Sequence, residues 1–73
     1  MNEEVLNSII ETNAQKILEV LNESRKISSW DIKMKLGLSN SMLYMAIGHL
    51  VSTNKIKVIS KDLIYILEIN QPS

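Results

Sequence analysis

The chain has 73 residues, no cysteine, one histidine and a formal net charge of zero. At this length we expect one small domain over residues 1–73, which buries only about 60–65% of the surface of its unfolded chain. The composition excludes disulfide bonds and thiolate metal sites, and a single histidine does not make a zinc site. No apolar stretch approaches the ~20 residues that a bilayer requires, and the acidic start lacks the features of a secretory signal, so we expect a cytoplasmic protein without membrane contact.

The charges are unevenly distributed along the chain. Residues 1–23 carry five glutamates against one lysine, a net charge of −4, and residues 24–73 carry seven basic against three acidic side chains, a net charge of +4. This asymmetry either marks an electrostatic face or arises by chance in so short a chain. If it has a function, the basic second part is where a nucleic acid would bind.

Apolar residues recur every three or four positions in the first third of the sequence, which predicts a long helix over about 4–22. The apolar series is Leu6, Ile9, Ile10, Ala14, Ile17, Leu18 and Leu21. Thr12 and Gln15 have the spacing of a capping box, so the alternative is a break near Thr12 and a helix that begins at Asn13. The long helix exceeds what a small helical domain needs, and it leaves Val5, Leu6 and Ile9 to be covered.

Two short helices follow, each with a serine at its start. Ser28 with an acid three residues later predicts a helix over 29–36, and Gly37 follows where a left-handed C-cap residue is needed. Ser39 caps the next helix, predicted over about 40–53. The inward candidates of these two helices are Trp30, Ile32, Leu36, Leu43, Ala46, Ile47, Leu50 and Val51. Trp30 is expected in the core or over the junction between the helices.

The pattern then changes to β structure. Residues 55–59 alternate polar with apolar, residues 60–62 interrupt the run, and residues 63–69 are rich in β-branched side chains, which together predict a hairpin. Ile27 either belongs to a linker or adds a third short strand. The predicted core is Ile10, Ala14, Ile17, Leu18, Leu21, Ile32, Leu36, Leu38, Leu43, Ala46, Ile47, Leu50, Ile56, Val58, Tyr65 and Leu67.

The order of helix, helix, helix and hairpin, with the segment Ile27-Ser28-Ser29-Trp30-Asp31-Ile32-Lys33-Met34-Lys35-Leu36-Gly37-Leu38-Ser39, resembles a known family. It looks like the short, stand-alone winged helix-turn-helix domain proteins of prokaryotes, a family of uncharacterised function, over residues 9–69. The resemblance implies a mainly α fold of three helices with a wing of two or three strands. The helix-turn-helix would span about 28–53 and the wing about 55–69. The position before Leu50, often tryptophan in that family, is His49 here, so the contact made by that ring is altered.

For DNA, the resemblance implies that the third helix enters the major groove and that the wing touches the flanking backbone. The third helix has no Lys or Arg, although cations supply most affinity for phosphates. Asn40 is a candidate reader of adenine, Ser41 of either base edge, and Tyr44 a candidate phosphate contact. The candidate cations are Lys33, Lys35, Lys55, Lys57 and Lys61. The competing interpretation is that these lysines are an ordinary solvated surface.

An apolar set of residues supports a different use of the same scaffold. Met34, Met42 and Met45 occupy positions that the core pattern does not require, and His49 belongs to the same candidate set. Methionine is frequent at protein-binding surfaces because its side chain adapts to a partner. These residues therefore mark a candidate partner-binding surface, unless they only complete a small core.

No enzymatic activity, cofactor or metal site is expected. His49 has no acid near it in sequence, and the two glycines are isolated, so neither a nucleophilic triad nor a phosphate-binding loop is indicated. The main hypothesis is a non-catalytic DNA-binding or transcription-related regulatory module that acts on double-stranded DNA. The alternative is a protein-interaction module, most simply a homodimer, that does not bind DNA.

Overall fold

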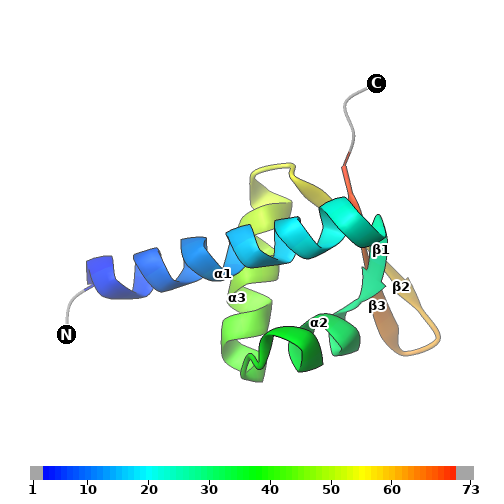
Figure 1. Cartoon of the computed structure of the whole chain (residues 1–73), viewed down its shortest axis with the longest axis horizontal. Coiled ribbons are helices and arrows are strands. Elements are labelled where there is room, and N and C mark those ends of the chain that lie inside the picture. The colour runs from blue at the N-terminus through cyan, green and yellow to red at the C-terminus, as the bar shows by residue number, and fades with distance from the viewer. Residues whose placement is uncertain (1–2, 71–73) are drawn as a thin grey trace.

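The fold consists of three helices and a three-stranded antiparallel sheet (Figure 1). The computed structural model describes residues 3–70, and side-chain environments from residue 5 onward. The elements are α1 (Glu3–Ser24), β1 (Lys26–Ser28), α2 (Ser29–Leu36), α3 (Asn40–Ser52), β2 (Ile56–Lys61) and β3 (Ile64–Ile69). The fold class is therefore the predicted one, with β1 as the third strand. None of the described helices is long and apolar enough to cross a membrane.

The caps that the sequence predicts for α2 and α3 are present. Ser28 Oγ accepts a hydrogen bond from the backbone N–H of Asp31 at 3.1 Å, and Ser39 Oγ accepts one from Met42 at 3.2 Å. Gly37 ends α2 with φ +66°, a conformation that glycine adopts without steric cost, and its N–H donates to the carbonyl of Lys33. These local bonds determine where α2 stops and α3 starts.

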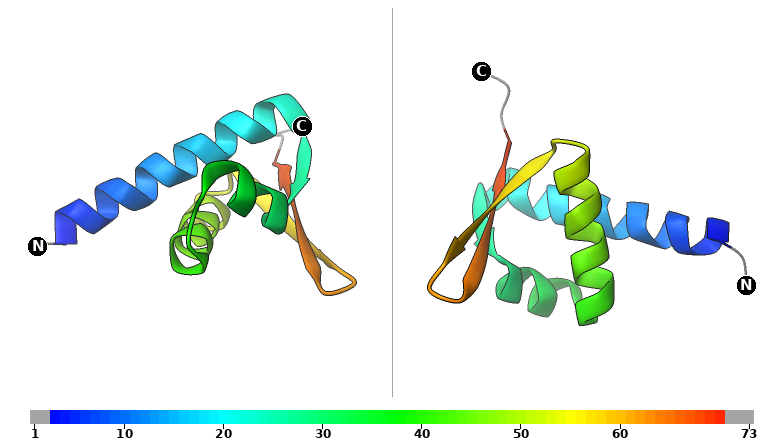
Figure 2. Two further views of the ribbon diagram at one scale, coloured as in Figure 1. Left: turned by 60° about the horizontal axis from the view of Figure 1, so that its bottom comes forward. Right: turned by 180° about the vertical axis from the view of Figure 1, so that it is seen from behind.

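α1 is one continuous helix of 22 residues, so the alternative of a break near Thr12 is wrong. Asn13, Ala14 and Ile17 are buried on the side that faces the rest of the molecule. Burial of this face keeps the helix continuous past Thr12 and Gln15, whose capping-box spacing favours a break. The helix packs mainly across α3, and its N-terminal end projects beyond the body, away from the hairpin (Figures 1 and 2). Val5, Leu6 and Ile9 on this projecting part are exposed.

β3 lies between β1 and β2, with all pairs antiparallel. The turn is shorter than predicted, because β2 continues through residues 60 and 61 and pairs Lys61 with Ile64. A two-residue turn remains, formed by Asp62 (φ +50°) and Leu63 (φ +70°). Positive φ at both positions is the type I′ geometry that suits the twist of a β-ribbon. The turn therefore lies at residues 62–63, whereas the sequence predicts the interruption at 60–62.

The core is aliphatic and lies where α1, α2 and α3 meet the sheet. The buried hydrophobic residues are Ala14, Ile17, Val20, Leu21, Ile32, Leu43, Ala46, Ile47, Leu50, Ile56 and Leu67. Val20 was not predicted, and Ile10, Leu18, Leu36, Leu38 and Val58 are only half-buried.

Three inward predictions were wrong. Tyr65 is exposed because it lies in the outer half of the hairpin, opposite Ser60 and near the turn. Val51 is exposed because it follows Leu50, which already occupies the buried side of α3. Trp30 is exposed because the eight-residue α2 buries only Ser29 and Ile32, and Trp30 projects away from that face.

Candidate nucleic-acid interface

A groove of about 270 Å³ lies between α2, the N-terminal half of α3 and the wing, here defined as the hairpin β2–β3 with its turn. Ser29, Trp30 and Lys33 line it from α2, Asn40, Leu43 and Tyr44 from α3, and Leu63, Ile64 and Tyr65 from the wing. Helix spacing explains the two helical walls. Trp30 and Lys33 are three residues apart, and Asn40 and Tyr44 are four apart, so each pair lies on one side of its helix.

All three aromatic residues of the chain line this groove. Trp30 is 61% exposed, Tyr44 47% and Tyr65 44%, and none of them contributes to the core. The rings of Tyr44 and Tyr65 meet edge to face, with centroids 6.3 Å apart and planes at 83°. The Nζ atom of Lys33 lies 5.6 Å from the centroid of the Trp30 ring, within the range of a cation–π contact. The groove thus combines aromatic faces with a positive charge.

Leu63 forms the tip of the wing and is fully exposed, at 101%. The second central position of a type I′ turn favours glycine or asparagine, since a side chain with a Cβ is strained at positive φ. A leucine there combines backbone strain with an apolar side chain in solvent. Neither feature stabilises the fold.

The structure brings only some of the predicted DNA-binding residues together. Lys33, Asn40 and Tyr44 meet in the groove, and Ser41 is exposed beside Asn40 at the start of α3. Lys35 and Lys61 are exposed, at the end of α2 and next to the wing turn.

Two predicted cations lie elsewhere. Lys55 lines a separate cavity beside α1. Lys57 lies on the outer sheet face, where its Nζ is 3.1 Å from Glu68 Oε1, and Lys26 Nζ is 3.5 Å from the other carboxylate oxygen. The hydrogen bond from Lys57, aided by both positive charges, holds the pKa of Glu68 below its ordinary value against the opposing effect of partial burial. Lys57 is therefore engaged within the sheet.

Part of the predicted partner-binding set lies in a second hollow, the notch between the projecting half of α1 and α3. This notch has a volume of about 490 Å³ and is lined by Asn7, Ile10, Glu11, Met45, Gly48, His49 and Ser52. Met45 and His49 are therefore neighbours of the exposed end of α1. Met34 is 63% exposed on α2 and Met42 is half-buried on α3, and neither lines the notch.

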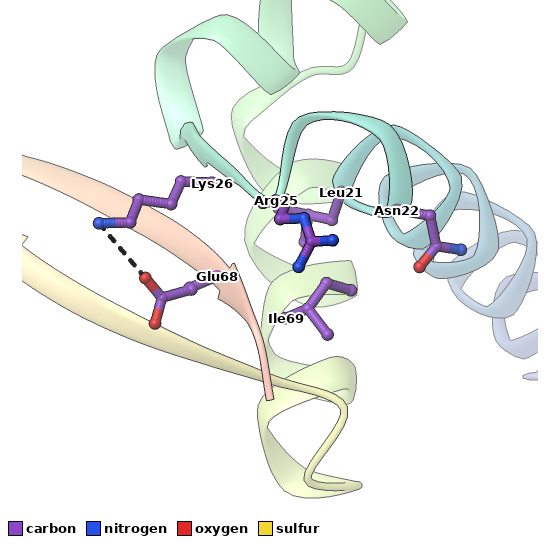
Figure 3. A pocket seen from close by; sticks show the side chains of 6 residues that line it. All are labelled: Leu21, Asn22, Arg25, Lys26, Glu68 and Ile69. Atoms are coloured by element: carbon purple, nitrogen blue, oxygen red, sulfur yellow. Dashed lines mark ion pairs between the residues drawn. The ribbon is translucent and has the colours of Figure 1, made fainter. Parts of the chain in front are cut away.

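A further cavity, of about 330 Å³, lies between the end of α1 and the sheet, and no sequence pattern predicts it (Figure 3). Figure 3 shows the Arg25 guanidinium beside Ile69, with the Lys26–Glu68 ion pair at the edge. Arg25 adopts φ +68°, which no pattern in the sequence signals. Among the described residues, no buried side-chain polar atom lacks a hydrogen-bond partner, and no group of His, Cys, Asp or Glu is arranged to hold a metal ion.

A capped helix, a glycine turn, a second capped helix and a β-hairpin packed on one core define a winged helix-turn-helix domain. The chain belongs to the family described as Winged helix-turn-helix domain (DUF2582), whose model matches residues 1–68. No curated protein and no solved structure matches the chain significantly. The family assignment therefore agrees with the fold and leaves the ligand to be argued from the surface.

Proposed function

We propose that this protein is a non-catalytic regulatory module that binds DNA with the open face formed by α3, α2 and the wing. The observation that carries the proposal is the meeting of Lys33, Asn40 and Tyr44 in one groove beside the wing. In winged helix-turn-helix domains the corresponding helix commonly enters the major groove while the wing contacts the flanking backbone. Lys35, at the end of α2, and Lys61, beside the wing turn, are further exposed cations on the elements that line the groove.

The composition of this face predicts weak binding with little sequence preference. α3 has no Lys or Arg, so base contacts rest on Asn40 and Ser41, and phosphate contacts on Lys33, Lys35 and Lys61. Three neutralised phosphates correspond to a slope of about −3 in a plot of log affinity against log salt concentration. Affinity in the range of ~1–100 μM is expected at physiological salt, which is typical of non-specific binding.

The test is binding to a random duplex at low and moderate salt. Changing Lys33, Lys35 and Lys61 together to Glu should abolish binding while the circular dichroism of the helices is unchanged. A matched triple change of Lys16, Lys26 and Lys55 to Glu alters the net charge equally on other exposed surfaces. Retained binding in the first variant, or equal loss in both, would refute the proposed face.

A second candidate function, homodimerisation, is favoured by the projecting end of α1. Leu6 and Ile9 are about 40% exposed there, and the notch beside them contains Met45. A small domain with a limited core often gains stability by pairing with a second copy. Met45→Glu should then convert a dimer into a monomer in light scattering, whereas Met34→Glu, on α2, should not. A dimer that persists in the Met45 variant would count against this surface.

A further inference from the structure

We propose that the groove between α2, α3 and the wing holds an unstacked nucleobase, so that the protein prefers unpaired nucleic acid to intact duplex. The inference rests on the proposed nucleic-acid binding and names the form of ligand that the site accepts. It concerns the same open face. In place of contacts to paired bases in the major groove, the groove would bind one base that has left the stack of the double helix.

The aromatic residues provide the first argument. A chain with three aromatic side chains would normally use them in its core, because each buries a large apolar area. Here Trp30, Tyr44 and Tyr65 all line one groove and all are 44% or more exposed. Exposed aromatic rings on which bases stack are the common device of proteins that bind single strands. The two tyrosine rings, with planes at 83°, form a corner in the lining of the groove.

Charge and size distinguish a base from other ligands. Lys33 is the cation of the lining, and no Asp or Glu is among the described residues that line the groove, so the lining itself carries a positive charge that attracts a phosphate. The amide of Asn40 offers both a donor and an acceptor, as the edge of a base requires. At about 270 Å³ the groove is smaller than the ~300–1,000 Å³ typical of sites for drug-sized ligands, so it suits one planar group.

Leu63 provides the second, independent argument. Proteins that bend or open DNA insert apolar wedges, leucine among them, between base steps. Leu63 is an apolar side chain at the tip of a β-ribbon, fully exposed, on a backbone with φ +70°. Strained residues of this kind cluster at functional sites, where the strain is part of the mechanism. Because Leu63 also lines the groove, a base displaced by it would lie next to the aromatic rings.

The experiment uses Trp30, the single tryptophan of the chain, as the reporter. The full-length protein is titrated at low salt with oligo(dU), oligo(U), a fully paired DNA duplex of equal length, and the same duplex with one unpaired central base. We expect quenching of Trp30 fluorescence by the unpaired ligands and affinity at least about ten-fold higher than for the paired duplex, since stacking adds this much per base. The single strand that gives the larger response shows whether the site prefers deoxyribose or ribose.

Variants connect the preference to the groove. Tyr65→Ala should weaken single-strand binding about five-fold or more and leave duplex binding nearly unchanged. Tyr44→Ala should weaken single-strand binding by a similar factor and weaken duplex binding less, since duplex binding loses only its contact with a phosphate. Leu63→Ala should remove the advantage of the duplex with one unpaired base. Ile59→Ala and Met34→Ala, both exposed apolar residues that do not line the groove, are the matched controls.

Each outcome decides the inference. Equal affinity for single strand and duplex, unaffected by the tyrosine variants, would overturn it and leave DNA binding intact. No binding to any of the four ligands would overturn both proposals. If Trp30 fluorescence instead responds only to protein concentration, with growth of an oligomer, the groove is a protein contact and the inference fails.

Discussion

Replacing Leu63 by glycine should stabilise the protein, although it removes a large side chain. Leu63 is fully exposed, so truncation loses no packing within the fold. A non-glycine residue in the left-handed region costs about 1–2 kcal/mol, and φ at Leu63 is +70°. Glycine offsets part of this gain because it loses about 0.5–1 kcal/mol more conformational entropy on folding. The net gain in free energy of unfolding is about 0.5–1 kcal/mol.

The assay is thermal unfolding followed by circular dichroism. For a domain of this size 1 kcal/mol corresponds to about 4–8 °C, so Leu63→Gly should raise Tm by about 2–8 °C. Leu63→Ala is the control, since it removes most of the side chain and keeps the strained backbone, and its Tm should stay near that of the wild type. Both variants should lose the proposed wedge and bind a duplex with one unpaired base less well.

The two variants separate the contributions of backbone and side chain. A fall in Tm for Leu63→Gly would refute the argument that φ at this turn is strained. A fall of similar size in Leu63→Ala would mean that the leucine side chain packs against the fold. A rise in Tm that comes with loss of binding would show that stability is given up at the wing tip for function.

Three further predictions concern the fold and its pH dependence. Ser39→Ala removes the cap of α3 and should lower stability by about 1 kcal/mol in urea unfolding, whereas no loss would mean that water replaces the cap. Gly37→Ala should also lower stability by about 1 kcal/mol. The whole cost comes from backbone strain at φ +66°, because an added Cβ meets no atom within 4 Å and so causes no clash; an unchanged urea midpoint would contradict this. The lowered pKa of Glu68 means that its contribution to stability is present above about pH 4.5, its ordinary value, and is lost as pH falls through the folded pKa. The difference in Tm between wild type and Glu68→Gln should therefore be largest near neutral pH and vanish in acid, and a constant difference would show that the ion pairs with Lys57 and Lys26 are not its source.

Local chemistry made much of the fold predictable from the sequence. The serine caps of α2 and α3 each act over three residues, and Gly37 acts on its own backbone, so these boundaries are written in neighbouring residues. The buried series of α3 from Leu43 to Leu50 likewise follows from helical periodicity. These signals survive in the structure because none of them depends on distant parts of the chain.

The candidate site was predictable only in part. Lys33, Asn40 and Tyr44 were singled out from the sequence, and the structure brings them into one groove. Trp30 and Tyr65 complete the aromatic lining, but the sequence pattern assigns Tyr65 to the core and Trp30 to the core or the junction between the helices. Propensity and pattern identify an apolar residue, but whether it is covered depends on where the neighbouring elements end.

By itself the sequence determined the capped helices, the glycine turn and the existence of a hairpin, because each depends on contacts a few residues apart. The continuity of α1, the exposure of the aromatic rings and the pairing of Lys57 with Glu68 arise from the way the elements pack against one another. That pairing depends on the hairpin register, which is set by the turn at Asp62 and Leu63. A slip of one residue would move every side chain of the strand to the opposite face of the sheet. The physical reason is the same in each case: burial and cross-strand neighbours belong to the packed assembly of elements, and no local stretch of sequence contains them.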